Sequence, residues 1–169
     1  MIKRLIDQIS VLIFSIPWVK SLWSKHFATI ESNTIPWAPL IKPLSECKMA
    51  LMTSGSVHLK NDLPFNMDDK NGDPTFRKIP SSTTHDKLMI THKYYNHQDA
   101  DKDINIVLPL DRLKEIQHIG YVGSSSKYFY SFMGHIDKNH IKTLVEKTAK
   151  EVAKRLKKEQ GDIVLLVPA

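Results

Sequence analysis

The sequence predicts an α/β domain with a parallel sheet, of the three-layer flavodoxin- or Rossmann-like type. Residues Asn139–Gln160 have helical periodicity, and Gly161 follows as a stop signal. The run Asp162–Val167 is continuously apolar after its first residue, which is typical of a strand buried on both faces. A further strand is predicted at Tyr128–Met133, before the helix. The three segments form a βαβ unit, which implies parallel strands.

The front of the chain is predicted to have three parts. Residues 1–34 are predicted as an N-terminal helical arm interrupted at Pro17, and residues 35–47 as a proline-rich linker. Residues 48–169 are predicted as the α/β domain, whose C-terminal part we expect to be missing. This domain begins with the apolar run Lys48–Thr53, which predicts a buried first strand that opens into a loop.

The middle of the chain is predicted to be less regular. Residues 61–87 are rich in Asp, Asn, Gly, Pro, Ser and Thr, and they predict one long loop. A short strand is predicted at Asn105–Leu108. Pro109 then precedes a helix that runs to about His118 and stops at Gly120. The apolar stripe of the last helix consists of Ile141, Leu144, Val145, Thr148, Val152 and Leu156.

Composition excludes several classes of protein. The chain has 169 residues and one cysteine, Cys47, which excludes an internal disulfide framework and a CxxC redox pair. We interpret Cys47 as a partly buried structural thiol and expect a reducing, cytoplasmic location. The N-terminal apolar run is shorter than the ~20 residues that a membrane span needs. The arm is amphipathic, and we favour packing on its own domain or a partner over contact with a membrane surface.

The positive charge is concentrated in one segment. The net charge is +6, and Lys138–Lys158 contains eight Lys or Arg and two Glu, which accounts for the whole excess. A solvated helix face and a nucleic-acid surface both have this composition. We favour the solvated face and expect no nucleic-acid partner, because no aromatic residues interleave with the lysines.

The turn Thr53–Lys60 (TSGSVHLK) is the first candidate binding motif. It follows the first predicted strand and is rich in hydroxyl groups and glycine, so it can present backbone N–H groups to an anion. It contains neither a P-loop nor a GxGxxG motif, and an ordinary βα turn has the same composition. His58 in this turn is a candidate acid, base or ligand.

The polar stretch Ile90–Asn105 is the second candidate motif. Imidazole and carboxylate groups of this kind can bind zinc, iron or manganese, but the spacing matches neither HExxH nor an EF-hand loop. We therefore predict no metal site and favour a hydrogen-bonded loop with some groups facing a substrate. The groups considered are His85, Asp86, His92, His97, Asp99, Asp101 and Asp103.

Seven segments occur in the order found in one known family. They are PWAPLIKPLSEC, ALMTSGSVHLK, DPTFRKIP, THKYYNHQDADKDIN, PLDRL, SFMG, and the final helix and strand that end in DIVLLVPA. On these segments the chain from about Pro36 onward resembles the selenoprotein B family of glycine, sarcosine, betaine and D-proline reductases. Residues 1–30 resemble the arm of the short, stand-alone members of that family.

The resemblance implies that a redox nucleophile, selenocysteine or cysteine, directly follows the strand Ile163–Val167. That position comes directly after Ala169, so we expect no catalytic nucleophile within these residues. One hypothesis is that the sequence stops at a UGA selenocysteine codon that was read as a stop. A deliberately shortened chain is the other. No bound cofactor is expected, apart from selenocysteine in the full-length form.

The resemblance also implies a mechanism and partners. The selenolate or thiolate attacks the carbon that bears the amino group of a small amino-acid-like substrate, and the C–N bond is cleaved reductively. His58 is implied as a proton donor to the leaving amine. Other reductase subunits or a thiol reductant are the implied partners, and a homo-oligomer is possible. The implied substrate-binding residues are Thr53, Ser54, Gly55, His92, Tyr95, Asp99, Asp103 and Asn105.

The sequence departs from the family pattern at two positions. Ser56 stands where many relatives have a second glycine, and Asn96 stands where many have Asp. Three functions stay open: a component of a selenol- or thiol-dependent reductase, which we favour, a non-catalytic module that binds a partner protein or a membrane surface, and a metal-dependent hydrolase. Because nothing in the sequence covers the final strand, we also expect the chain to associate.

Overall fold

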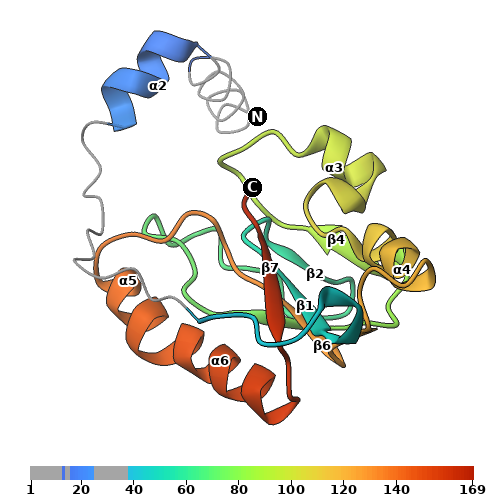
Figure 1. Cartoon of the computed structure of the whole chain (residues 1–169). Coiled ribbons are helices and arrows are strands. Elements are labelled where there is room, and N and C mark those ends of the chain that lie inside the picture. Colours follow the sequence, from blue (N-terminus) through green and yellow to red (C-terminus); the bar gives the residue numbers. More distant parts are fainter. Residues whose placement is uncertain (1–12, 14–15, 25–37) are drawn as a thin grey trace. The chain divides into compact units, whose positions relative to one another are not determined.

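The computed structural model describes residues 13, 16–24 and 38–169 (Figure 1). The chain divides into two compact units. One contains residues 1–39 and 93–96, and the other contains residues 40–92 and 97–169. In the first unit the described helix is α2 (Pro17–Ser24), which begins at the proline predicted to interrupt the arm. A proline is tolerated in the first helical turn because its missing N–H group would lack a partner there.

Most of the predicted arm, and residues 35–37 of the predicted linker, lie outside the described residues. Within the described part of the chain, no helix is long and apolar enough to cross a membrane.

The second unit is built on a five-stranded sheet, and this confirms the α/β prediction. The strand order is β3-β6-β1-β5, and β7 also pairs with β1, along Met49–Thr53. β5, β6 and β7 all run parallel to β1, while β3 runs antiparallel to β6, so the sheet is mixed. The strands are β1 (Lys48–Thr53), β3 (Arg77–Pro80), β5 (Ser124–Ser125), β6 (Tyr128–Ser131) and β7 (Ile163–Val167).

β1 is the centre of the core. Ala50 and Leu51 are fully buried, and β7 pairs with β1 in continuous register from Met49–Ile163 to Thr53–Val167. The apolar sequence of β1 explains this position, because a central parallel strand is covered on both faces.

The prediction that the last strand is buried on both faces is wrong for the described chain. Val164, Leu165 and Leu166 on β7 are 37%, 43% and 65% exposed. Among the described residues, β7 has β1 as its strand neighbour on one edge and no strand partner on the other.

The last helix is confirmed, with one irregular turn. It consists of α5 (Asn139–Thr143), a π-helical turn at Leu144–Thr148, and α6 (Ala149–Lys158). Val152 and Leu156 of the predicted stripe are buried, but Val145 is half exposed. The π turn adds a residue to one helical turn, and this displaces Val145 from the face that regular spacing predicts.

Two strands that the sequence did not predict form a small second sheet. β2 (Val57–Leu59) pairs antiparallel with β4 (Leu88–Ile90). The predicted long loop between them contains β3 and a 3₁₀ turn at His85–Lys87. These elements escaped prediction because strands of three or four residues contain too little periodicity to stand out.

The segment after β4 is helical. It contains α3 (Gln98–Lys102), a 3₁₀ turn at Ile104–Ile106 and α4 (Leu110–His118). The helix prediction is confirmed, but the strand predicted at Asn105–Leu108 is wrong. The side chain of Asp103 accepts the N–H of Asn105 and caps the 3₁₀ turn instead. Figure 1 shows α6 on one side of the large sheet, and α4 with β2 and β4 on the other.

Candidate functional site

The carboxyl ends of three parallel strands meet at one edge of the sheet. Thr53 at the end of β1 is in register with Ser131 on β6 and with Val167 on β7. In open α/β sheets this edge is where ligands bind. The loops that leave it contain Ser54 and Gly134, which lie close to Ala169.

Ser54 forms two hydrogen bonds with the last residues of the chain, at and after the end of β7. Its N–H donates to the carbonyl of Val167 at 3.1 Å, and its Oγ accepts the N–H of Ala169 at 2.9 Å. The backbone that follows β7 is therefore held directly over the TSG turn, at the carboxyl edge.

Two glycines make this close approach possible. A Cβ on Gly55 would lie 3.0 Å from the Cβ of Val107 and 3.5 Å from the Cβ of Ala169. A Cβ on Gly134 would lie 3.1 Å from the carbonyl oxygen of Ala169 and 3.3 Å from that of Ser54. Larger residues at either position would push the end of β7 away from the turn.

Ser56 adopts a backbone conformation that favours glycine. Its φ is +56°, and its hydroxyl is buried without a hydrogen-bond partner among the described residues. Its N–H donates to Phe132, and its carbonyl accepts from Thr91, so both neighbouring segments fix the conformation. The left-handed backbone gives a physical reason for the glycine of the family pattern at this position.

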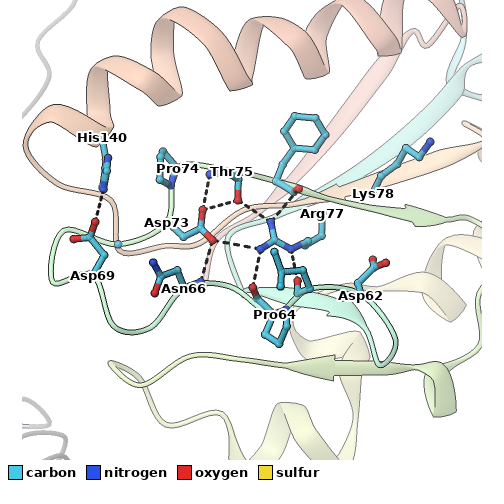
Figure 2. Close-up of a pocket in the computed structure, with 13 residues that line it drawn as sticks. Asp62, Pro64, Asn66, Asp69, Asp73, Pro74, Thr75, Arg77, Lys78 and His140 are labelled. Carbon is cyan, nitrogen blue, oxygen red and sulfur yellow. Dashed lines mark hydrogen bonds and ion pairs between the residues drawn. The ribbon is translucent and has the colours of Figure 1, made fainter.

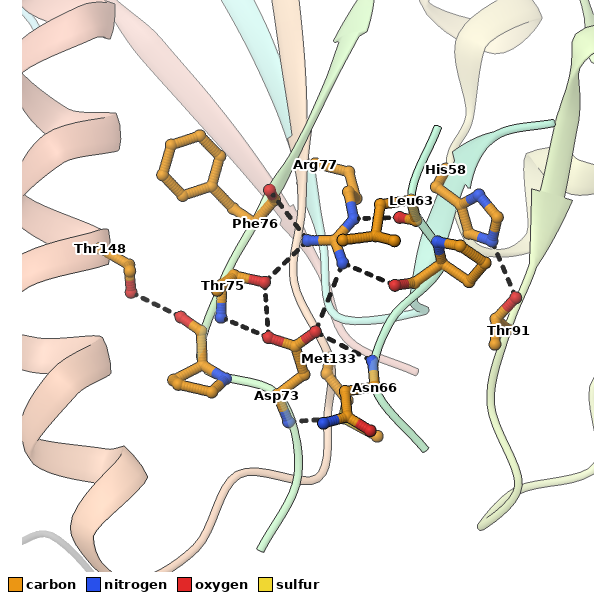
Figure 3. A network of polar contacts seen from close by, with 12 residues as sticks. His58, Leu63, Asn66, Asp73, Thr75, Phe76, Arg77, Thr91, Met133 and Thr148 are labelled. Atoms are coloured by element: carbon orange, nitrogen blue, oxygen red, sulfur yellow. Dashed lines mark hydrogen bonds and ion pairs between the residues drawn. The ribbon is translucent and has the colours of Figure 1, made fainter. Parts of the chain in front are cut away.

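His58 lies on β2 and is fully buried (Figure 3). Its Nδ1 donates to the carbonyl of Leu59 at 2.7 Å, and its Nε2 lies 2.8 Å from the hydroxyl of Thr91. Because a carbonyl can only accept, Nδ1 bears a proton, and the other ring nitrogen, Nε2, faces Thr91. Thr91 is only partly buried, and its N–H donates to Ser56 beside the TSG turn.

His92 follows β4 and Thr91, and it is mostly buried. Burial, together with the nearby charges of His135 and His97, lowers the pKa of His92 to about 4. Its ring is therefore neutral at physiological pH. His97 donates from Nε2 to the carbonyl of His92, and His135 donates from Nε2 to the carbonyl of Lys70.

Two of the other predicted site residues bond to each other, and a third pairs with a lysine. Asp103 and Asn105 lie together before α4, where Asn105 Oδ1 accepts the N–H of Asp111 at 3.0 Å and caps the helix. Hydrogen bonds from Asn105 hold the pKa of the Asp103 carboxyl below its usual range. Asp99 is exposed and pairs with Lys102 in solvent. Tyr95 belongs to the first unit.

Within the described residues, no three His, Cys, Asp or Glu side chains form a group that could hold a metal ion. Ser131, Gly134, His135 and Thr91 also lie at or near the carboxyl edge, and sequence reasoning missed them as site residues. The motif SFMG contains the first two and was their only signal.

A groove of about 960 Å³ lies between residues 62–78 and His140 on α5 (Figure 2). Its wall contains a saturated polar network of Asp73, Thr75 and Arg77, drawn in Figure 3. The guanidinium of Arg77 also lies over the ring of Phe65, 4.2 Å from its centroid. The Nε2 of His140 donates a hydrogen bond to the carboxylate of Asp69 at 2.8 Å at one end of the groove.

This groove is joined to the carboxyl edge by the segment after β6. Asp73 N–H donates to the Sδ of Met133 at 3.1 Å, and Asp137 N–H donates to the carbonyl of Asn71 at 2.9 Å. Gly72 forms an antiparallel bridge with Ile136. The loop that the DPTFR motif builds therefore supports the segment that places Gly134 beside Ala169.

The fold and these contacts define an α/β domain with a polar edge at the carboxyl ends of its parallel strands. The family model described as glycine/sarcosine/betaine reductase selenoprotein B matches residues 19–169. The chain belongs to this family.

Curated relatives agree with the family match. The chain is 34% identical over 148 residues to the D-proline reductase subunit gamma of Acetoanaerobium sticklandii, a match that covers 88% of this chain and 59% of that protein. It is 29% identical over 138 residues to the glycine reductase complex component B subunit gamma of Symbiobacterium thermophilum, covering 79% and 31%. The sarcosine reductase complex component B subunit beta of Peptoclostridium acidaminophilum is 29% identical over 106 residues, covering 60% and 24%.

The chain thus spans about three-fifths or less of the length of these relatives. No solved structure matches it.

Proposed function

We propose that this chain forms the substrate-binding edge of a cytoplasmic, selenol- or thiol-dependent reductase component. The substrate class is a small amino acid or a methylated or cyclic derivative, as the names of the relatives suggest. The single observation that carries the proposal, beyond the family itself, is the bond from Ala169 N–H to Ser54 Oγ at the carboxyl edge. It directs whatever follows β7 into the place where ligands bind in this fold class.

The chemistry needs a nucleophile with a low pKa directly after β7. A selenolate or thiolate there would form a bond to the carbon that bears the amino group, while the C–N bond breaks. The electron pair of that bond goes to nitrogen, which takes up a proton. A dithiol reductant then attacks the selenium or sulfur, the bond to carbon breaks and the carbon takes up a proton. The second thiol displaces the selenolate or thiolate, so the nucleophile is regenerated and the dithiol becomes a disulfide. The open turn at Thr53, Ser54 and Gly55 would bind the charged end of the substrate.

His58 is proposed to supply the proton through Thr91. The buried ring has no direct path to the edge, but its Nε2 contacts the hydroxyl of Thr91, and Thr91 bonds to Ser56 beside the turn. Because Nδ1 already holds a proton against the carbonyl of Leu59, this step needs a second proton on Nε2. The ring would donate that proton to the Thr91 hydroxyl as the hydroxyl donates its own proton to the leaving amine. Neutral His92 would add a hydrogen-bonding group without adding charge.

Reading the gene in frame beyond the codon for Ala169 tests this proposal first. A UGA codon followed by an open frame with a cysteine codon, an amphipathic helix and a selenocysteine-insertion hairpin would support it. An in-frame cysteine codon would support the thiol form. A UAA or UAG codon with no coding sequence behind it would overturn the redox function for this polypeptide.

The assembled reductase provides the second test. Glycine, sarcosine, betaine and D-proline are each supplied with a dithiol, and release of the amine is measured, or ring opening for D-proline. Ser54→Ala should lower turnover about tenfold to hundredfold, because the end of β7 is no longer fixed. Ser54→Thr, which keeps the hydroxyl, is the matched control. Equal losses in the two variants would contradict the role of the hydroxyl.

A non-catalytic binding module is the second candidate function, and the exposure of β7 favours it. Three consecutive aliphatic side chains on an edge strand are the kind of surface that associates with another chain. This alternative becomes the working proposal if the gene ends at Ala169.

A further inference from the structure

The last helix contains the excess positive charge of the chain. Every Lys and Arg from Lys138 to Lys158 is exposed. Arg155 pairs with Glu151 at 2.8 Å and lies over the ring of Phe76. The seven lysines of this segment form no ion pair with any described residue.

Five of these lysines lie on the outward side of the helix. Val152 and Leu156 of α6 are buried against the sheet. Lysines three and four residues apart share a helix face, and the exposed ones fall on the side opposite these two. We call them the lysine stripe: Lys147, Lys150, Lys154, Lys157 and Lys158.

The stripe is unfavourable to the isolated helix. Lys150 and Lys154, and Lys154 and Lys158, are like charges four residues apart, a spacing that destabilises a helix. Lys157 and Lys158 lie in the last turn, where the helix dipole favours positive charge, but Lys147, Lys150 and Lys154 lack that compensation. The stripe itself contains no acidic residue, and Glu151, which flanks it, is already paired with Arg155. Negative charge supplied by another molecule would therefore stabilise this face of the helix.

We propose that the lysine stripe docks an acidic protein surface on a partner subunit of the reductase. This inference rests on the proposed function, because the relatives are named as subunits of reductase complexes. A protein fits the stripe better than a nucleic acid does. No aromatic side chain lies among Lys147–Lys158 to stack on bases, and the single arginine is already paired with Glu151. Lysines act as point charges that suit carboxylates spread over a surface.

Binding of labelled poly-L-glutamate to the purified chain tests the proposal, with fluorescence anisotropy as the readout. The stripe variant is K147E/K150E/K154E, and K147Q/K150Q/K154Q is a milder form in case the first fails to fold. The matched control is K60E/K70E/K87E, which changes three other exposed lysines and lowers the net charge equally. Circular dichroism checks the helix in each variant.

The stripe variants should bind poly-L-glutamate about tenfold or more weakly, while the control stays close to the wild type. The wild-type affinity should fall between low salt and about 0.15 M salt, as expected for exposed charges. Failure of the wild type to bind, or an equal loss in the control, would overturn the proposal. Tighter binding of duplex DNA or of phosphatidylglycerol vesicles than of poly-L-glutamate would overturn it in favour of those partners. Failure here leaves the in-frame gene test of the proposed function unaffected.

Discussion

Asp73 and Arg77 lie 3.3 Å apart and use all of their hydrogen-bonding capacity on the protein itself. The Asp73 carboxylate accepts from the N–H and hydroxyl of Thr75, the N–H of Asn66 and the Arg77 guanidinium. The five N–H groups of Arg77 donate to four more acceptors besides Asp73. The pair therefore holds a loop in place and has no free donor for a substrate, although it belongs to a motif that marks the family.

Arg77→Lys should destabilise the domain by about 2–4 kcal/mol. Lysine keeps the charge but loses the planar fork, which leaves the carbonyls of Leu63 and Pro64 without their donors. Urea unfolding measures the change. Arg112→Lys is the matched control, because the Arg112–Glu115 pair is exposed and should contribute less than about 1 kcal/mol. Equal effects of the two substitutions would contradict the role assigned to the network.

The free energy of unfolding should depend on pH in the acid range because of the lowered pKa of the Asp73 carboxyl. Burial raises its pKa, but the hydrogen bonds from Thr75 and Asn66 and the charge of Arg77 lower it by more, so the folded pKa lies below the ordinary value of 3.8. The stabilisation is then present above pH 3.8 and lost as the pH falls through the folded pKa. Unfolding curves from pH 6 downward should show a shallower acid loss for Asp73→Asn than for the wild type. If the two proteins lose stability equally with falling pH, the Asp73 carboxylate does not contribute to the pH dependence.

Gly72→Ala should be among the most damaging single changes in the loop. Gly72 has φ +86°, and a Cβ there would lie 1.7 Å from the carbonyl oxygen of His135. We expect a loss of about 3 kcal/mol or more, because backbone must move and the bridge to Ile136 is broken. Gly120→Ala is the control that measures the cost of a positive φ without a steric clash. Gly120 has φ +79° with nothing within 4 Å, so its cost should be only about 1 kcal/mol.

Ser56→Gly should stabilise the domain by about 1 kcal/mol. Glycine adopts φ +56° without strain, and it removes a buried hydroxyl that has no partner among the described residues. Part of this gain is offset because glycine raises the conformational entropy of the unfolded chain. Thermal unfolding provides the measurement. Gln160→Gly, at φ +57° on the surface, is the comparison and should gain less, since it removes no buried polar group. A destabilised Ser56→Gly variant would mean that the hydroxyl has a partner of its own.

β7 should cause the purified chain to associate with itself. Leu166 is 65% exposed on an edge strand that has no charged residue between Ile163 and Val167. Leu166→Lys should therefore reduce concentration-dependent association in sedimentation velocity, with little change in the unfolding midpoint. Leu63→Lys, at a site that is 80% exposed but far from β7 in the chain, should leave association unchanged. A monomeric wild type would refute this prediction.

Local sequence was enough to predict the main elements of the fold. The apolar run of β1, the periodic helix that ends before Gly161 and the run of β7 each carry a signal within a few residues. Their βαβ order implied parallel strands and hence a polar edge where Thr53, Ser54 and the end of β7 meet. The strands β2, β3 and β4 carried no comparable signal, because each is only three or four residues long.

Only the tertiary structure decided what individual side chains do. Asp73, Arg77 and Asn66 form one network because a loop folds back on β3, and this contact depends on no local pattern. From the sequence, His58 was a candidate acid, base or ligand. In the structure it lies on β2, which pairs with β4, and it is buried. Its Nε2 contacts the hydroxyl of Thr91. The sequence by itself therefore determined the family, the βαβ core and the edge that forms the site, because periodicity and chain order are local. Burial and the choice of hydrogen-bond partner depend on which distant segments meet, so they were decided by the fold.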